Sequence, residues 1–190
     1  MKNRIKNTFL GQAELLKKLS ESEMIGAIED ACAALVDCLS RGNKILIAGN
    51  GGSAADAQHF AAELVGRFMK ERKGLAAIAL TTDTSILTSV ANDYDYDIVF
   101  ERQVEALGKK GDVFIGFSTS GNSSNIINAV EKASCLKMKT LGFLGKDGGK
   151  LAAMCDNSLI IPSDTTARVQ EIHEMIIHLM CEEIENQLFD

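Results

Sequence analysis

The chain has 190 residues, with 26 acidic and 20 basic side chains and a net charge of −6. This length suits a single domain over residues 1–190, and 46% hydrophobic with 24% charged residues excludes a largely disordered chain. The acidic balance argues against a general nucleic-acid-binding protein, which would show a basic face.

The first forty residues predict two helices, at 4–20 and 22–40, because apolar residues recur there at helical spacing. Five short apolar runs follow, at 44–48, 76–81, 112–117, 140–144 and 159–162, and we interpret them as strands buried on both faces. Helical segments are expected at 53–68, 83–91, 96–107, 122–135, 150–155 and 167–188.

Strands that alternate with helices imply right-handed crossovers, and therefore an α/β fold with a parallel sheet between two helical layers. The helices within residues 1–40 and the long closing helix are additional to that pattern. We expect the 1–40 extension to pack on the domain and in an oligomer.

The five cysteines form no CxxC pair, so they predict reduced thiols rather than a disulfide framework. No apolar run approaches the ~20 residues of a membrane helix, and the N-terminus has no apolar segment of a signal peptide. We therefore expect a cytoplasmic protein with no membrane segment.

Ligands of open α/β sheets bind beyond the carboxyl ends of the strands, and two loops there have an unusual composition. Residues 49–53 read GNGGS, where glycines let the backbone approach an anion; a tight turn with Ser53 as helix cap is the alternative. Residues 118–125 hold five hydroxyls and two amides before a helix, which predicts a neutral phosphate cup rather than a solvated loop. Asn92 and Asp93, taken alone, indicate a helix-terminating turn.

Two helices supply ionisable side chains. His59 and Glu63 are four residues apart, and Gln170, Glu174 and His178 follow the same spacing on the closing helix. His173 and Glu174 look like the start of an HExxH motif, but His178 comes one position too late, so the chain is not a zincin.

Taken together, these segments resemble the sugar isomerase (SIS) domain family and, within it, the phosphoheptose isomerases. The resemblance rests on GNGGSAADAQHFAAEL (49–64), AND (91–93), GDVFIGFSTSGNS (111–123), GKDGG (145–149) and ARVQEIH (167–173). It implies a three-layer αβα sandwich around a five-stranded parallel sheet, with N-terminal helices and a long C-terminal helix. It also implies a homotetramer with active sites between subunits.

The activity that the resemblance implies is conversion of sedoheptulose 7-phosphate to D-glycero-D-manno-heptose 7-phosphate through an enediol. This reaction is the first step towards nucleotide-activated heptose for surface polysaccharide. The implied acid and base are Glu63 and His178. The implied ligands of one zinc ion per subunit are His59, Glu63, Gln170 and His178. The implied substrate contacts are Asn50, Gly51, Gly52, Ser53, Glu63, Asn92, Asp93, Ser118, Thr119, Ser120, Ser123 and Gln170.

A histidine nitrogen bound to zinc cannot also carry a transferable proton, so zinc is either displaced by substrate or orients it. We expect zinc to assist while Glu63 and His178 transfer the protons.

Two other functions fit parts of the sequence. Non-catalytic SIS-domain adaptors that bind the replication initiator share the glycine loop, but they resemble this chain without a histidine at position 178. A nucleotide-binding oxidoreductase is supported only by the glycine spacing, which passes as a dinucleotide fingerprint. That spacing explains neither His59 and Glu63 nor the serine-rich loop, so the isomerase is the favoured interpretation.

Overall fold

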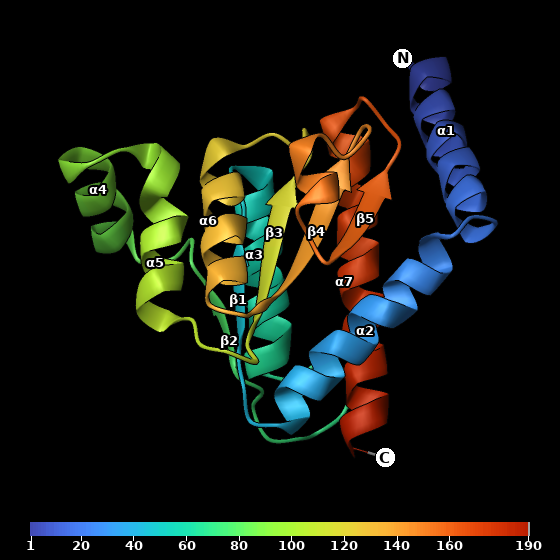
Figure 1. The fold of residues 1–190 in the computed structure, drawn as a ribbon. Helices are drawn as coiled ribbons and strands as arrows, with labels where there is room; N and C mark the ends of the chain where they lie inside the picture. The colour runs from blue at the N-terminus through green and yellow to red at the C-terminus, as the bar shows by residue number, and fades with distance from the viewer. Residues whose placement is uncertain (190) are drawn as a thin grey trace.

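The computed structural model describes residues 1–189, and its centre is a five-stranded parallel sheet between two layers of helices (Figure 1). The strands lie in the order β2-β1-β3-β4-β5. Their bounds are β1 (Ile45–Ala48), β2 (Ala77–Ala79), β3 (Val113–Ser118), β4 (Lys139–Gly145) and β5 (Asn157–Ile161). The predicted α/β sandwich with a five-stranded parallel sheet is therefore confirmed.

The helices divide between the two faces of the sheet. One face is covered by α2 (Met24–Ser40), α3 (Gly52–Val65) and α7 (Thr166–Phe189). The other is covered by α5 (Val99–Leu107) and α6 (Ser124–Cys135), and α4 (Thr84–Asp93) lies beside α5. Two short 3₁₀ helices, η1 (Tyr96–Ile98) and η2 (Lys150–Ala153), complete the connections.

The strands are mostly apolar because both of their faces are largely buried. Ile45 and Ile47 of β1 pack in the cluster with α2, α3 and α7, whereas Leu46 and Ala48 pack with α5 and α6. Side chains alternate between the two faces of a sheet, so β1, β3, β4 and β5 each supply both cores, whereas the edge strand β2 supplies only the first. Apolar residues without alternation are the pattern expected of a covered parallel strand.

Several predicted helices have other bounds in the structure: 96–107 divides into η1 and α5, 150–155 is the shorter 3₁₀ helix η2, and the helices predicted at 53–68 and 83–91 end elsewhere. The helix expected to reach residue 68 ends at Val65, because Gly66 follows and Arg72 takes the last carbonyl groups of α3. The helix expected to stop at residue 91 continues through Asp93. Asn92 and Asp93 are therefore helical residues of α4, and not part of a non-helical turn after it.

The first helix, α1 (Lys2–Ser20), extends away from the sheet (Figure 1). It exposes Ile5, Phe9 and Leu10, and Gln12 donates a hydrogen bond of 3.2 Å to the carbonyl of Arg168. All five cysteines are free thiols. Within residues 1–189, no helix has both the length and the apolarity that a membrane span requires.

Candidate active site

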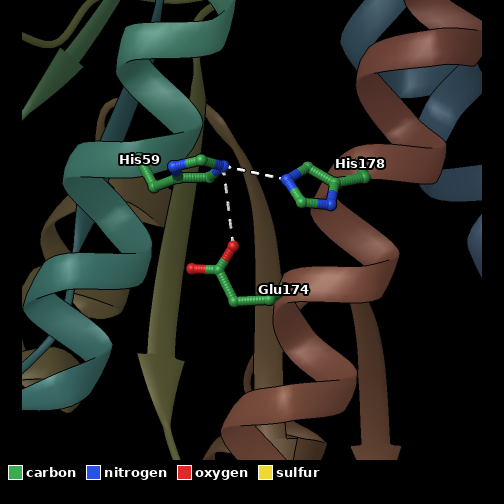
Figure 2. A group of neighbouring side chains, drawn as sticks. All are labelled: His59, Glu174 and His178. Carbon is green, nitrogen blue, oxygen red and sulfur yellow. Dashed lines mark hydrogen bonds and ion pairs between the residues drawn. The ribbon is translucent and has the colours of Figure 1, made fainter.

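Two histidines from separate helices meet between α3 and α7. Figure 2 shows His59 of α3 facing His178 of α7, with 2.9 Å between their Nε2 atoms. Two carboxylates approach the same nitrogen of His59: Glu63 Oε1 at 3.5 Å and Glu174 Oε2 at 3.7 Å. In neutral imidazoles, one of the two facing nitrogens must carry the proton and the other must accept it.

The group also has the composition of a metal site. One ligand atom from each of His59, Glu174 and His178 lies within 4.8 Å of the others. Two imidazoles with a carboxylate are a known ligand set of catalytic zinc, which binds them at about 2.0–2.2 Å and keeps one position open. The donor set and its spacing therefore fit zinc.

The ligand set that the structure brings together differs in part from the one expected. His59, Glu63 and His178 are neighbours, but the Gln170 side chain contacts the turn at Gly52 and Ser53. Glu174 was not assigned a role from the sequence, although it lies one helical turn before His178 and therefore faces the same side of α7.

His59 lies on the body of α3 rather than at the end of a strand. His59 is seven residues into α3, so it lies ~10 Å along the helix from the glycine loop. The opposite side of α3 carries buried Ala57, Phe60 and Ala61, which pack in the core. This apolar stripe turns His59 and Glu63 towards α7.

A third carboxyl group lies one helical turn before His59 on α3. Asp56, three residues before His59, is only 5% exposed, and its Oδ2 has no hydrogen-bond partner within residues 1–189. Burial, together with the neighbouring Glu174 carboxylate, raises the pKa of Asp56 to about 7. Asp56 was not identified from the sequence, where it is an acidic residue flanked by alanines at positions 54, 55 and 57.

The glycine loop is tied to both α7 and α6. Gly51 caps α3 with a φ of 59°, and the helix has no side-chain cap, so Ser53 is not the cap considered as the alternative. Instead, Gln170 Nε2 lies 3.5 Å from Ser53 Oγ. Asn50 and Asn125 exchange two amide hydrogen bonds of 2.9 Å, which fix the loop against the start of α6.

The serine-rich loop turns its hydroxyls towards one another. Ser118 Oγ lies 2.9 Å from Ser123 Oγ and 3.4 Å from Ser120 Oγ. Ser123 occupies the N-cap position of α6 without making a side-chain cap bond, so its hydroxyl and the amides of the first turn suit an anion. At Gly121, with φ of 66°, a Cβ would lie 2.0 Å from the carbonyl oxygen of Gly148. Thr119 lies in the same loop, half-buried.

The remaining predicted contacts, Asn92 and Asp93, are exposed at the end of α4, where Asn92 Nδ2 donates to Asp93 Oδ1 at 2.8 Å. Tyr96, to which no role was assigned from the sequence, places its hydroxyl 3.3 Å from Asn50 Oδ1. This contact links the segment after α4 to the glycine loop.

His173 has a different environment from the other two histidines. It is fully buried, its Nε2 donates to the carbonyl of Leu144 at 3.3 Å, and its ring forms T-shaped pairs with Phe117 and Phe143. Burial lowers the pKa of His173 to about 4, so it is neutral at physiological pH. The rejection of an HExxH site from residue spacing agrees with this placement.

Comparison with known proteins gives consistent results. Residues 9–145 match the SIS domain family. The chain is 55% identical to the phosphoheptose isomerase of Aliarcobacter butzleri over 188 residues, which is 99% of each chain. Its fold is similar to the phosphoheptose isomerase structures from Neisseria gonorrhoeae (TM-score 0.91, 46% identity, 97% and 98% of the chains) and Francisella tularensis (TM-score 0.93, 39% identity, 97% of both).

Proposed function

The chain belongs to the SIS domain family, and we propose that it interconverts sedoheptulose 7-phosphate and D-glycero-D-manno-heptose 7-phosphate. The similarity to phosphoheptose isomerases extends over 97% of the chain in one of the solved structures. This conversion moves a carbonyl from C2 to C1 of a phosphorylated sugar, and it consumes no other reactant.

The observation that carries the proposal is the meeting of His59 and His178 beside two carboxylates. An aldose–ketose isomerisation needs one group that takes a proton from carbon and another that moves a proton between the two oxygens. A carboxylate and an imidazole within a few ångströms of each other meet that need. The adaptor alternative resembles this chain without a histidine at position 178, so it does not account for the pair.

In this proposal Glu63 removes the proton from C1 of the ketose, which leaves an enediol, and returns it to C2 in the aldose. His178 donates a proton to the carbonyl oxygen and takes one from the neighbouring hydroxyl. The Phe68 ring stacks on His178 with 5.6 Å between ring centroids and 20° between planes, which restricts rotation of the imidazole. A fixed imidazole is a requirement for proton transfer along one direction.

His59, Glu174 and, until substrate displaces the ion from it, His178 would hold the zinc ion, with Glu63 also in reach; Gln170 would have to turn from Ser53 to join them. When bound, zinc supplies Lewis-acid polarisation of the carbonyl and hydroxyl oxygens. Asp56 accounts for a further part of the arrangement, since a protonated Asp56 could donate to the Glu174 carboxylate and hold its orientation.

The phosphate would bind in the serine-rich loop. Ser118, Ser120 and Ser123 offer hydroxyls, and α6 offers the free amides of its first turn. Gly52 and Gln170 would then line the space between the phosphate and the histidines. Anchoring the distant phosphate aligns the reacting end of the sugar, which is how binding energy lowers the barrier.

We also propose a homotetramer whose subunits complete one another's sites, and a cytoplasmic location. Exposed Ile5, Phe9 and Leu10 on α1 support an interface with another copy, because an isolated helix of this length is marginal in water unless it packs. The free cysteines agree with a reducing compartment. Light scattering on a sizing column measures the assembly directly.

The proposal is tested by incubating the purified protein with sedoheptulose 7-phosphate and following the aldoheptose by NMR. We expect conversion with zinc present, a decrease when a chelator is added, and loss in His178→Ala. Exposed Glu131 of α6 offers a control, because Glu131→Gln changes a carboxylate in the opposite helical layer and should leave turnover unchanged. Full turnover by Glu63→Gln with zinc bound would end its assignment as the base.

A further inference from the structure

The end of α3 is capped by an arginine that lies well beyond it in the chain. Arg72 Nη2 donates to the carbonyl of Glu63 at 2.8 Å, and Nη1 donates to the carbonyls of Leu64 at 2.8 Å and Gly66 at 3.3 Å. The last carbonyls of a helix have no partner within the helix, and a cation there also suits the helix dipole. The guanidinium therefore fixes the backbone of Glu63, the proposed base.

The same arginine is held by a carboxylate of α7. Glu185 Oε1 accepts from Arg72 Nε at 2.8 Å, and both side chains are 1% exposed. Glu185 also accepts from three consecutive backbone amides, those of residues 68–70, at 2.7–2.9 Å. Burial alone would raise the pKa of Glu185, but these amides and Arg72 hold it at about 2. The carboxylate is therefore charged and its oxygens have partners.

The loop that Glu185 anchors leads to the other proposed catalytic group. The amide of Phe68 is one of the three that donate to Glu185, and the ring of the same residue stacks on His178. Glu185 follows His178 by two helical turns on α7, so both lie on one side of the helix, ~10 Å apart along its axis. The buried pair of Arg72 and Glu185, called the node below, thus contacts the backbone of Glu63 and, through Phe68, the ring of His178.

We propose that Arg72 and Glu185 are positioning residues that set the distance between the Glu63 carboxylate and the His178 imidazole. The proposal rests on the function proposed above. The node joins the ends of α3 and α7, the two helices that carry all the ligand atoms of the candidate zinc group. A change in the node shifts those helices relative to each other, and a shift of about 1 Å at reacting groups can cost a factor of 10² in rate.

The competing interpretation is a node that only stabilises the fold, and the molecule contains a matched control for it. Asp112 is fully buried and accepts from the backbone amides of Lys44 and Lys109 as well as from the Lys44 ammonium. It joins the starts of β1 and β3, and no hydrogen bond described for it involves the histidine helices. Asp112→Asn should therefore lower stability as Glu185→Gln does, without touching the site.

The test compares Glu185→Gln and Arg72→Lys with Asp112→Asn, each as the full assembled chain. We expect the two node variants to lower kcat by about 10- to 100-fold while KM stays within about threefold. We also expect their zinc affinity, measured by competition with a chelating dye, to fall about tenfold or more. Asp112→Asn should keep both values while losing thermal stability.

Three results would overturn the proposal: unchanged kcat and zinc affinity in folded Glu185→Gln, an equal loss in Asp112→Asn, or a loss that appears only in KM. If the node variants fail to fold, Phe68→Leu gives the second measurement, because it keeps the node and removes only the ring that reaches His178. It should lower kcat in the same direction. Failure of the proposed function is seen separately, as wild-type protein that does not convert the sugar; zinc affinity then still decides whether the node positions the group.

Discussion

Glu185 and Asp112 are both buried carboxylates with cationic partners, but the elements that they anchor differ. Glu185 binds Arg72 and the loop between α3 and β2, whereas Asp112 binds Lys44 and the turn before β3. Both satisfy their charges with backbone amides, as buried carboxylates must. The difference between them is what the anchored segments carry: one holds the helices of the candidate site, and the other holds the starts of two strands. Equal burial therefore does not indicate an equal part in function.

The largest expected effect is a loss of stability common to both carboxylates. Glu185→Ala and Asp112→Ala each leave several backbone amides without an acceptor and remove the carboxylate partner of a cation, Arg72 or Lys44, which costs about 3–5 kcal/mol of unfolding free energy. Urea denaturation followed by circular dichroism measures both variants. A loss of less than about 1 kcal/mol in either variant would contradict this expectation, because that carboxylate would then not hold its segment.

Lowering the pH tests how much the charge of Glu185 contributes to stability. Its pKa is about 2 in the folded protein and near 4.5 in the unfolded chain, so the unfolded state binds more protons between these values. The stability that Glu185 contributes is complete above about pH 4.5 and is lost as the pH falls towards 2, by at most about 1.4 kcal/mol per pH unit. Melting temperatures measured between pH 5 and pH 3 should fall less steeply in Glu185→Gln than in the wild type. Parallel slopes would contradict this assignment.

A neutral buried pair should separate substrate binding from catalysis. Asn125→Ala removes both amide bonds to Asn50 and loosens the glycine loop, at a cost of about 1–3 kcal/mol in stability. Because the pair anchors the loop at the start of α3, ~10 Å along that helix from His59, we expect KM to rise while kcat changes by less than about threefold. Steady-state kinetics beside Glu185→Gln, for which kcat is the value expected to fall, tests the contrast. A fall in kcat alone would place the pair with the node.

The smallest change in stability is expected at Gly52. A Cβ there would lie 2.5 Å from Gln170 Nε2, the far end of a flexible side chain that can move aside. Gly52→Ala should therefore change the unfolding free energy by less than about 1 kcal/mol, since alanine also favours a helix over glycine. Displacement of Gln170 should nevertheless raise KM. An unchanged KM would remove Gly52 and Gln170 from the proposed substrate contacts.

The strands could be predicted because each is a local apolar run that glycine or polar residues close. The loop between α3 and β2 could not, because its course depends on Glu185, 113 residues away from Arg72 in the sequence. The expected helix over 53–68 ran three residues too far for this reason: the spacing of apolar residues continues past Gly66, whereas the partners of the helix end come from elsewhere. Local patterns indicate elements, and distant partners decide where they end.

The candidate site divides in the same way. His59 and Glu63 were found from their spacing on one helix, and their proximity to His178 was expected from the family resemblance. Glu174 had the correct spacing from His178 but no assigned role, and Asp56 had no periodic signal. The pKa of Asp56 is raised by burial and by the Glu174 carboxylate. The two residues are more than a hundred positions apart in the sequence, so neither the burial nor the contact could be predicted from it.

The distance in sequence between His59 and His178, 119 residues, has a consequence for how the protein is made. Synthesis proceeds from the N-terminus at about 5–20 residues per second, so α3 leaves the ribosome several seconds before the second histidine exists. Contacts of such long range also form slowly, because closing a long loop loses chain entropy before the contacts that offset this loss are made. The nascent chain therefore passes through a stage with its sheet largely translated and only half of its histidine pair, unable to capture a metal at that pair until α7 docks.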